Sequence, residues 1–149
     1  MPDDSGHRSG RLLVRLIRLV TACYWVAMCV GTHLPVPPDV VPTNVSDTWL
    51  HLGAYFGLGV LLMGSVAADR RVCRRDTIRL WILVTCYGAL DELTQMIPML
   101  HRTAEWKDLG ADMVGAGAGV LVGLVLALFV QPTVEDEIPT RQSEISVER

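Results

Sequence analysis

The side chains most able to do chemistry are several carboxylates, accompanied by a histidine, an amide and an arginine. Asp47 and His51 are four positions apart, as are Asp108 and Asp112, and residues at this spacing share one face of an α-helix. Carboxylates beside a histidine can exchange protons with a substrate or bind a divalent ion. The candidate polar site comprises Asp47, His51, Asp91, Glu92, Gln95, Arg102, Asp108 and Asp112.

The surrounding sequence shows no nucleophile motif. The four cysteines, Cys23, Cys29, Cys73 and Cys86, have none of the spacings of metal-binding motifs. We therefore assign no catalytic residue and predict neither a cofactor nor a bound metal ion. Nucleic-acid binding is not predicted either, because the basic residues are split between separate blocks rather than gathered on one domain.

The elements that must position the polar residues are predicted to be transmembrane helices. Half of the 149 residues are hydrophobic, and the charges gather in blocks at 1–18, 69–79 and 131–149. A hydrocarbon core of about 30 Å requires roughly 20 mostly apolar residues in a helix. Four windows meet this requirement, at about residues 12–34, 48–68, 78–97 and 109–130.

We therefore predict an all-α membrane bundle of four helices over residues 12–130, preceded by a cytoplasmic tail at 1–11. The polar, acidic residues 131–149 are predicted to form a disordered cytoplasmic tail. A soluble bundle is disfavoured because Gly119–Val130 is apolar on every side. A cleavable signal peptide is disfavoured because the small-x-small cleavage pattern is missing near the N-terminus.

The distribution of arginine predicts the orientation, because short loops rich in Lys and Arg stay in the cytoplasm. The connection at 35–47 has no Lys or Arg, and the one at 98–108 has only Arg102 and Lys107, balanced by Glu105 and Asp108. Both termini are therefore predicted to be cytoplasmic. The arginines on that side are Arg8, Arg11, Arg15, Arg18, Arg70, Arg71, Arg74, Arg75 and Arg79.

In this topology all the candidate polar residues, together with His33 at the end of the first helix, fall in the outer half of the membrane. The topology used only Lys and Arg, so this convergence indicates a single outward-facing site. Asp91 lies about 10 Å inside the outer end of its helix, too deep for its side chain to reach the headgroups. We expect it to need a partner such as His51 or Arg102, and we expect Asp91, His51 and Asp112 to act together.

Small residues predict where the helices approach one another most closely. Gly53 and Gly57 on the second helix are one turn apart, and Gly115, Gly119 and Gly123 continue the same spacing on the fourth. Such small-xxx-small patterns allow helix backbones to approach closely within a membrane. The glycines therefore predict tight helix contacts around the polar site.

Two segments resemble the VanZ-like family of membrane proteins. Ser46–Leu62 reads SDTWLHLGAYFGLGVLL, and Asp91–Gly123 reads DELTQMIPMLHRTAEWKDLGADMVGAGAGVLVG. The family pattern pairs an Asp and a His one turn apart before a Tyr-Phe-Gly stretch, followed by DExxQ, an Arg-bearing loop, an Asp and a Gly-rich helix. The resemblance covers roughly residues 30–130. The chain departs from the pattern at Thr48, where Lys commonly follows the Asp, and at Asp112, where Asn is common.

The resemblance implies a polytopic envelope protein of the bacterial cytoplasmic membrane, and some members of the family raise tolerance to the glycopeptide antibiotic teicoplanin. It does not supply a reaction. We expect membrane lipids as partners, and the sequence leaves the oligomeric state open. The leading hypothesis is that the outward pocket binds a cell-envelope component, such as a lipid headgroup or a peptidoglycan precursor, and affects what reaches the outer surface.

Three other hypotheses stay open. The protein could be an enzyme acting on a lipid-linked substrate, with His51 and a carboxylate as acid–base partners or as ligands for a divalent ion. It could be a proton or ion translocator that uses Asp91, Glu92 and Asp112. The polar residues could also form a purely structural cluster.

Overall fold

The computed structural model describes residues 4–33, 47–97 and 105–130, and over these ranges it is all-helical. The helices are α1 (Asp4–His33), α2 (Asp47–Asp69), α3 (Arg74–Gln95) and α4 (Trp106–Val130). The predicted all-α class is confirmed. The predicted tail at 131–149 and the candidate site residue Arg102 lie outside the described residues.

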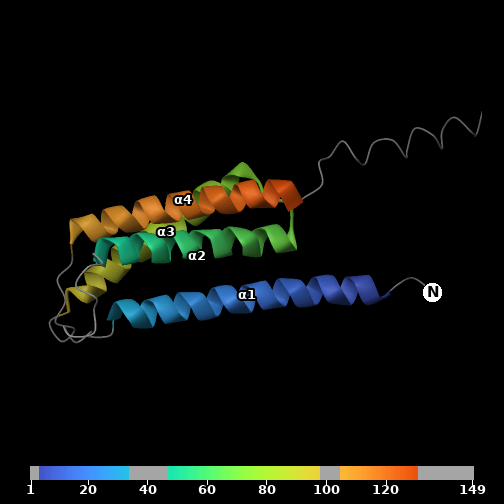
Figure 1. Cartoon of the computed structure of the whole chain (residues 1–149), viewed down its shortest axis with the longest axis horizontal. Coiled ribbons are helices and arrows are strands. Elements are labelled where there is room, and N and C mark those ends of the chain that lie inside the picture. Colours follow the sequence, from blue (N-terminus) through green and yellow to red (C-terminus); the bar gives the residue numbers. More distant parts are fainter. Residues whose placement is uncertain (1–3, 34–46, 98–104, 131–149) are drawn as a thin grey trace, which may run out of the picture.

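The helices run in alternating directions along the bundle, and α3 crosses the others obliquely (Figure 1). The start of α1 and the end of α4 therefore lie at one end, which we call the proximal end. The opposite end, where α1 ends and α2 begins, is the distal end. All the candidate polar residues on the described helices belong to turns near the distal end.

Three helical segments are long and apolar enough to cross a membrane, namely Gly10–His33, Asp47–Asp69 and Trp106–Val130. Among the described helices α3 does not belong to this group, and it carries Arg74, Arg75 and Arg79 in its first turns and two acids near its end. The structure therefore supports a membrane protein with three candidate spans. It leaves the predicted fourth span open.

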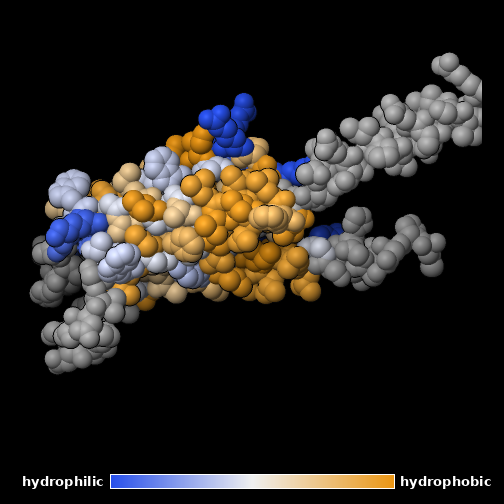
Figure 2. Space-filling model, turned by 45° about the horizontal axis from the view of Figure 1, so that its top comes forward, coloured by the Kyte–Doolittle hydropathy of each residue, from blue (hydrophilic) through white to orange (hydrophobic). Residues whose placement is uncertain are grey.

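The surface between the two ends of the bundle is mainly apolar (Figure 2). Hydrophilic residues gather toward the ends. Large apolar side chains are exposed in the middle parts of the helices, among them Leu16, Leu83 and Leu121. A soluble protein rarely exposes so extensive an apolar surface. This distribution is typical of a protein whose helices face lipid.

The most extensive contact between two described helices joins α2 and α4, and glycines permit it. A Cβ atom added at Gly115 would meet the carbonyl oxygen of Leu52, and one added at Gly119 would meet the carbonyl oxygen of Phe56. The predicted close approach at the glycines of α4 is confirmed. The two helix backbones touch, with no side chain between them.

On α2 the glycine that faces α4 is not the one we expected. A Cβ atom at Gly59 would lie 2.8 Å from the carbonyl oxygen of Ala116, whereas one at Gly53 would have nothing within 4 Å. Gly57 faces α1 instead, where the hydroxyl of Tyr24 donates a hydrogen bond of 2.9 Å to the carbonyl oxygen of Ala54. The rotation of α2 about its axis decides which glycine meets which neighbour.

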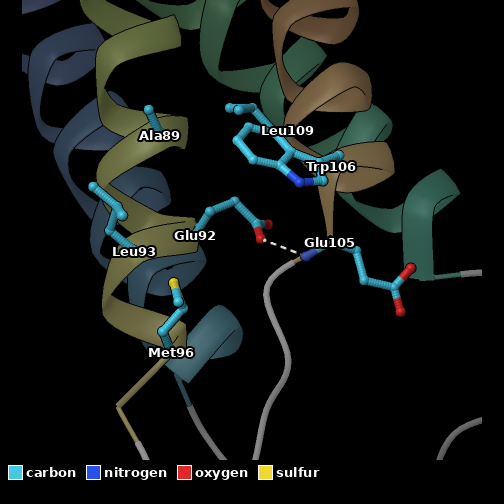
Figure 3. A pocket seen from close by; sticks show the side chains of 7 residues that line it. All are labelled: Ala89, Glu92, Leu93, Met96, Glu105, Trp106 and Leu109. Carbon is cyan, nitrogen blue, oxygen red and sulfur yellow. Dashed lines mark hydrogen bonds between the residues drawn. The ribbon is translucent and has the colours of Figure 1, made fainter.

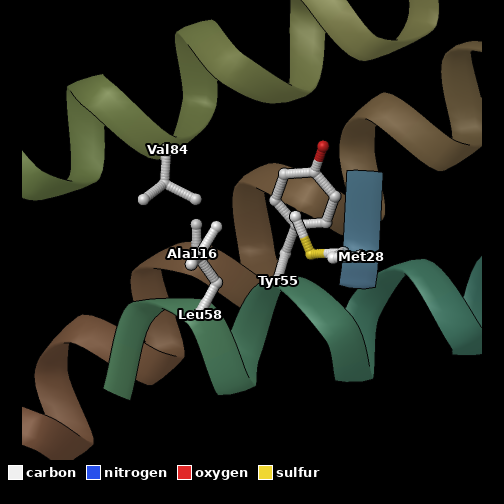
Figure 4. Packing of buried hydrophobic residues seen from close by; sticks show 5 residues of the cluster. All are labelled: Met28, Tyr55, Leu58, Val84 and Ala116. Atoms are coloured by element: carbon white, nitrogen blue, oxygen red, sulfur yellow. The ribbon is translucent and has the colours of Figure 1, made fainter. Parts of the chain in front are cut away.

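All four helices meet in an apolar layer that lies next to the polar residues, on their proximal side (Figure 4). Its members are Met28 from α1, Tyr55 and Leu58 from α2, Val84 from α3 and Ala116 from α4. Tyr55, Leu58, Val84 and Ala116 are fully buried. We call these five residues the apolar layer.

The start of α3 is fixed at the proximal end by a buried carboxylate. Arg70 donates two hydrogen bonds to Asp76, of 2.8 and 2.6 Å, and the backbone N–H of Cys73 donates a third of 2.9 Å. The bonds from Arg70, followed by that from Cys73, hold the pKa of Asp76 below its ordinary value. The carboxylate is therefore charged and ties the first turn of α3 to the preceding connection.

The α2–α4 contact can be tested by adding a single methyl group. Replacing Gly by Ala within a helix ordinarily stabilises a protein by about 0.5–1 kcal/mol, but at Gly119 the methyl group would force α2 and α4 apart. We expect Gly119→Ala to destabilise the protein by about 1–3 kcal/mol, measured by unfolding in detergent. Gly53→Ala is the matched control and should be neutral or stabilising. Equal stability of the two variants would contradict the close contact.

Candidate functional site

Polar side chains from three helices meet at the distal end. The structure brings together Asp47 and His51 from α2, Glu92 from α3, and Asp108 and Asp112 from α4, and we call these five residues the distal cluster. One metal-binding atom from each of His51, Glu92 and Asp112 lies within 4.8 Å of the others, and the same holds for Asp47, His51 and Asp108. His51 belongs to both groups and is the centre of the cluster.

The strongest contact in the distal cluster joins His51 and Asp112. Nδ1 of His51 lies 3.0 Å from Oδ1 of Asp112, and the side chains are 4% and 0% exposed. A carboxylate accepts hydrogen bonds, so Nδ1 carries the proton in this bond. The imidazole also stacks on the ring of Tyr55, with ring centroids 6.4 Å apart and planes 7° from parallel. Both contacts fix the orientation of the ring.

Gly88 on α3 has no side chain, and the carboxylate of Asp112 lies in the space that a side chain there would fill. A Cβ atom added at Gly88 would lie 3.0 Å from Oδ2 of Asp112 and 3.2 Å from Cε1 of Tyr55. The missing side chain therefore allows the carboxylate of α4 to lie directly against the backbone of α3. The site depends on close helix contacts on both sides of α4.

Two carboxylate oxygens in the distal cluster are buried without a hydrogen-bond partner in the described part of the chain. They are Oε1 of Glu92 and Oδ2 of Asp112. The other oxygen of Glu92 accepts a bond of 3.1 Å from the backbone N–H of Glu105. A buried polar atom without a partner is costly, so these two oxygens are the places where the cluster could bind a ligand.

Asp47 and Asp108 form the outer rim of the distal cluster. Oδ1 of Asp108 accepts a hydrogen bond of 2.7 Å from the hydroxyl of Thr48, and Asp108 is buried while Asp47 is exposed. Thr48 occupies the position where the family pattern commonly has Lys. Here its hydroxyl links the first turn of α2 to the first turn of α4.

Asp91 belongs to a separate network with α1. Its buried carboxylate accepts a bond of 2.9 Å from the hydroxyl of Thr32 and one of 3.1 Å from the amide of Gln95. Nδ1 of His33 lies 3.5 Å from the same carboxylate. Nε2 of His33 lies 2.8 Å from the hydroxyl of Thr94, which fixes the imidazole against α3.

This network differs from the one we expected. We expected His51 or Arg102 to be the partner of Asp91, but His51 bonds to Asp112, and Arg102 lies outside the described residues. Thr32 was missed. The available signal was that its hydroxyl lies beside His33 in the last turn of the first span, at the depth at which Asp91 needs a partner.

A pocket of about 370 Å³ opens beside the distal cluster, between α3 and α4 (Figure 3). Glu92 extends from α3 toward α4, and the Trp106 ring of α4 lies opposite Ala89 of α3. The walls are therefore largely apolar. The Glu92 carboxylate projects between the two helices, whereas the Glu105 carboxylate points away from it. The lining residues are Ala89, Glu92, Leu93, Met96, Glu105, Trp106 and Leu109.

The arrangement has two chemical capacities. A histidine oriented by a carboxylate can transfer a proton, as in general acid–base catalysis. A histidine beside two carboxylates can also bind a cation. Glu92 connects both to the pocket, because it belongs to the distal cluster and lines the pocket as well.

Comparisons of the chain with protein-family models, with curated proteins and with solved structures found no match. The resemblance to the VanZ-like family is therefore carried by the quoted motifs alone. The geometry of the site and the apolar surface of the helices supply the remaining support for a function.

The two networks can be separated by double-mutant cycles. Asp112→Asn removes the charge at similar size, and His51→Phe keeps a ring against Tyr55 while removing both nitrogens. We expect the pair to show a coupling energy of about 1 kcal/mol or more, because the two side chains share a buried hydrogen bond. The measurement is unfolding in detergent of both single variants and the double variant.

The matched cycle combines Asp91→Asn with His51→Phe. Asp91 is bonded to Thr32 and Gln95, so these two changes should be additive within about 0.5 kcal/mol. Equal coupling in the two cycles would show that Asp91 and the distal cluster form one unit, as the sequence led us to expect.

Proposed function

We propose that this chain is a VanZ-like protein of the bacterial cytoplasmic membrane that binds a cell-envelope component at its distal end. The ligand would be a lipid headgroup or a peptidoglycan precursor, and the binding would affect what reaches the outer surface. A contribution to teicoplanin tolerance is part of the same proposal. The proposal rests on four spans, on an outward-facing distal end and on the pocket beside Glu92.

The burial pattern of α3 supports the fourth span. Asp91, Glu92 and Gln95 are buried within the bundle, whereas the positions of α3 that face outward beyond Leu80 are apolar. A hydropathy average counts buried acids as though they faced lipid, so it underestimates such a helix. The outward-facing residues of this part of the chain are Trp81, Ile82, Leu83, Cys86, Leu90, Leu93, Met96 and Ile97.

The arginines support a cytoplasmic proximal end. Arg74, Arg75 and Arg79 are exposed in the first turns of α3, and Arg18 forms an ion pair of 2.9 Å with Asp69 at the end of α2. Short connections rich in arginine remain on the cytoplasmic side. With four spans, both termini would then be cytoplasmic and the distal cluster would face outward.

The topology is tested with single-cysteine variants. One variant keeps only Cys73, which is exposed between α2 and α3, and the other has Lys107→Cys in a cysteine-free chain. We expect an impermeant thiol reagent to label position 107 on intact cells and Cys73 only after permeabilisation. If both positions react from the same side, α3 does not cross the membrane.

The observation that carries the binding proposal is the position of Glu92. Its buried carboxylate has one oxygen without a partner in the described part of the chain. The Glu92 side chain lines a pocket together with Leu93, Met96, Trp106 and Leu109. An apolar wall suits a lipid chain, and a carboxylate suits an amine or a cation bound to a phosphate. An amphiphilic molecule fits both.

The proposal is tested by analysing the lipids that copurify with the protein in mild detergent. We expect one class of envelope lipid or lipid-linked precursor to be enriched with the native chain and to fall at least about tenfold in Glu92→Gln, a loss of about 1.4 kcal/mol in binding. Asp69→Asn changes an exposed carboxylate at the proximal end and is the matched control. An unchanged lipid profile in Glu92→Gln would overturn the proposal.

One observation favours an enzyme as the second candidate function. The pair of His51 and Asp112 lies next to Glu92, so a general acid–base group adjoins the pocket. Ion translocation receives no comparable support, because the apolar layer separates the distal cluster from Asp76 at the proximal end. The described helices supply no acidic residue that would carry a proton across that layer.

A further inference from the structure

We propose that His51, Glu92 and Asp112 form a binding site for a divalent transition-metal ion with mixed nitrogen and oxygen preference, such as Zn²⁺ or Mn²⁺. This inference goes beyond the proposed lipid binding and does not depend on it. The sequence assigned no metal-binding residues, but it left open His51 and a carboxylate as ligands for a divalent ion. The three ligands come from three helices, so no short sequence spacing could have indicated them.

The distances suit one ion. Zinc binds imidazole nitrogen and carboxylate oxygen at about 2.0–2.2 Å, so two ligands of a tetrahedral ion lie roughly 3.4 Å apart. In the hydrogen-bonded state Nδ1 of His51 and Oδ1 of Asp112 are 3.0 Å apart, and an atom of Glu92 lies within 4.8 Å of the other ligand atoms. A bound ion would replace the proton that Nδ1 donates to Asp112, and that proton would be released to solvent. Binding would bring the Glu92 carboxylate closer to the ion.

The unpartnered oxygens are the independent observation that points to a ligand. Oδ2 of Asp112 belongs to a residue with no exposed surface, and Oε1 of Glu92 to one that is 6% exposed. Each lacks a hydrogen-bond partner in the described part of the chain, and each belongs to a carboxylate of this group of three. One cation would satisfy both carboxylates, which removes the cost of burying them side by side.

The surroundings hold the ligands as supporting groups do in metal sites. The backbone N–H of Glu105 fixes one oxygen of Glu92, and the Tyr55 ring supports the imidazole of His51. Three protein ligands leave one position of a tetrahedral ion open. Glu92 also lines the pocket, so one ligand of the ion adjoins a molecule bound there.

The alternative group of Asp47, His51 and Asp108 is the weaker candidate. Asp47 is exposed, and Oδ1 of Asp108 already accepts a hydrogen bond from Thr48. Neither aspartate has a buried oxygen without a partner in the described part of the chain. We therefore assign the metal site to His51, Glu92 and Asp112. Substitutions of Asp112 and of Asp47 distinguish this group from the alternative one.

The test uses the full chain without a polyhistidine tag, stripped with a chelator and titrated with Zn²⁺ or Mn²⁺ in detergent. We expect one ion per chain, and we expect Asp112→Asn and His51→Phe each to weaken binding at least about tenfold. Asp91→Asn and Asp47→Asn should bind as the native chain does, because they change a neighbouring network and the outer rim. Circular dichroism checks that each variant is helical.

If a variant fails to fold, titration of the unmutated chain with Co²⁺ still tests whether the native site binds a metal ion. We expect the visible absorption of cobalt with nitrogen and oxygen ligands, and its loss on addition of Zn²⁺. Absence of stoichiometric binding by the native chain would overturn the inference, and so would loss of binding in Asp91→Asn equal to that in Asp112→Asn. Metal binding with an unchanged lipid profile in Glu92→Gln would overturn only the proposed lipid binding.

Discussion

In the proposed four-span topology, the cost of placing an ionisable side chain at membrane depth governs the arrangement of the polar residues. That cost is roughly 2.5–3.5 kcal/mol per group on insertion scales, and it falls when the group faces protein rather than lipid. His51, Asp91, Glu92 and Asp112 are all buried, and α1 provides partners for Asp91 while α2 provides one for Asp112. The apolar outer surface and the polar distal interior follow from this single constraint.

Close helix contact makes such an interior possible. The backbones of α2 and α4 touch at Gly115 and Gly119, and this contact fixes the separation across which His51 meets Asp112 at 3.0 Å. Side chains of ordinary size at these glycines would part the helices and break the hydrogen bond. The glycines and the polar residues therefore depend on one another. Because Gly115 and Gly119 have no side chains, α2 and α4 lie close enough for His51 to contact Asp112.

Sequence patterns predicted the features that depend on one helix at a time. The all-α class and the position of His51 one turn after Asp47 required only helical periodicity. The partner of Asp91 could not be predicted, because it depends on how α1 is rotated and on the reach of the Thr32 hydroxyl. Gly53 and Gly59 illustrate the same limit: both are small, and only the rotation of α2 places Gly59 against α4.

The composition of α3 bears on how the chain enters the membrane during synthesis. In the proposed topology α3 has too many polar residues to be stable in lipid alone, and two of its acids find partners outside α3. Thr32 in the last turn of α1 is the partner of Asp91, and the backbone N–H of Glu105 is the partner of Glu92. Glu105 immediately precedes α4 and is made after α3. α3 would therefore be stable in the membrane only after Glu105 and α4 have been synthesised. In this topology the insertion of α4 completes the insertion of α3.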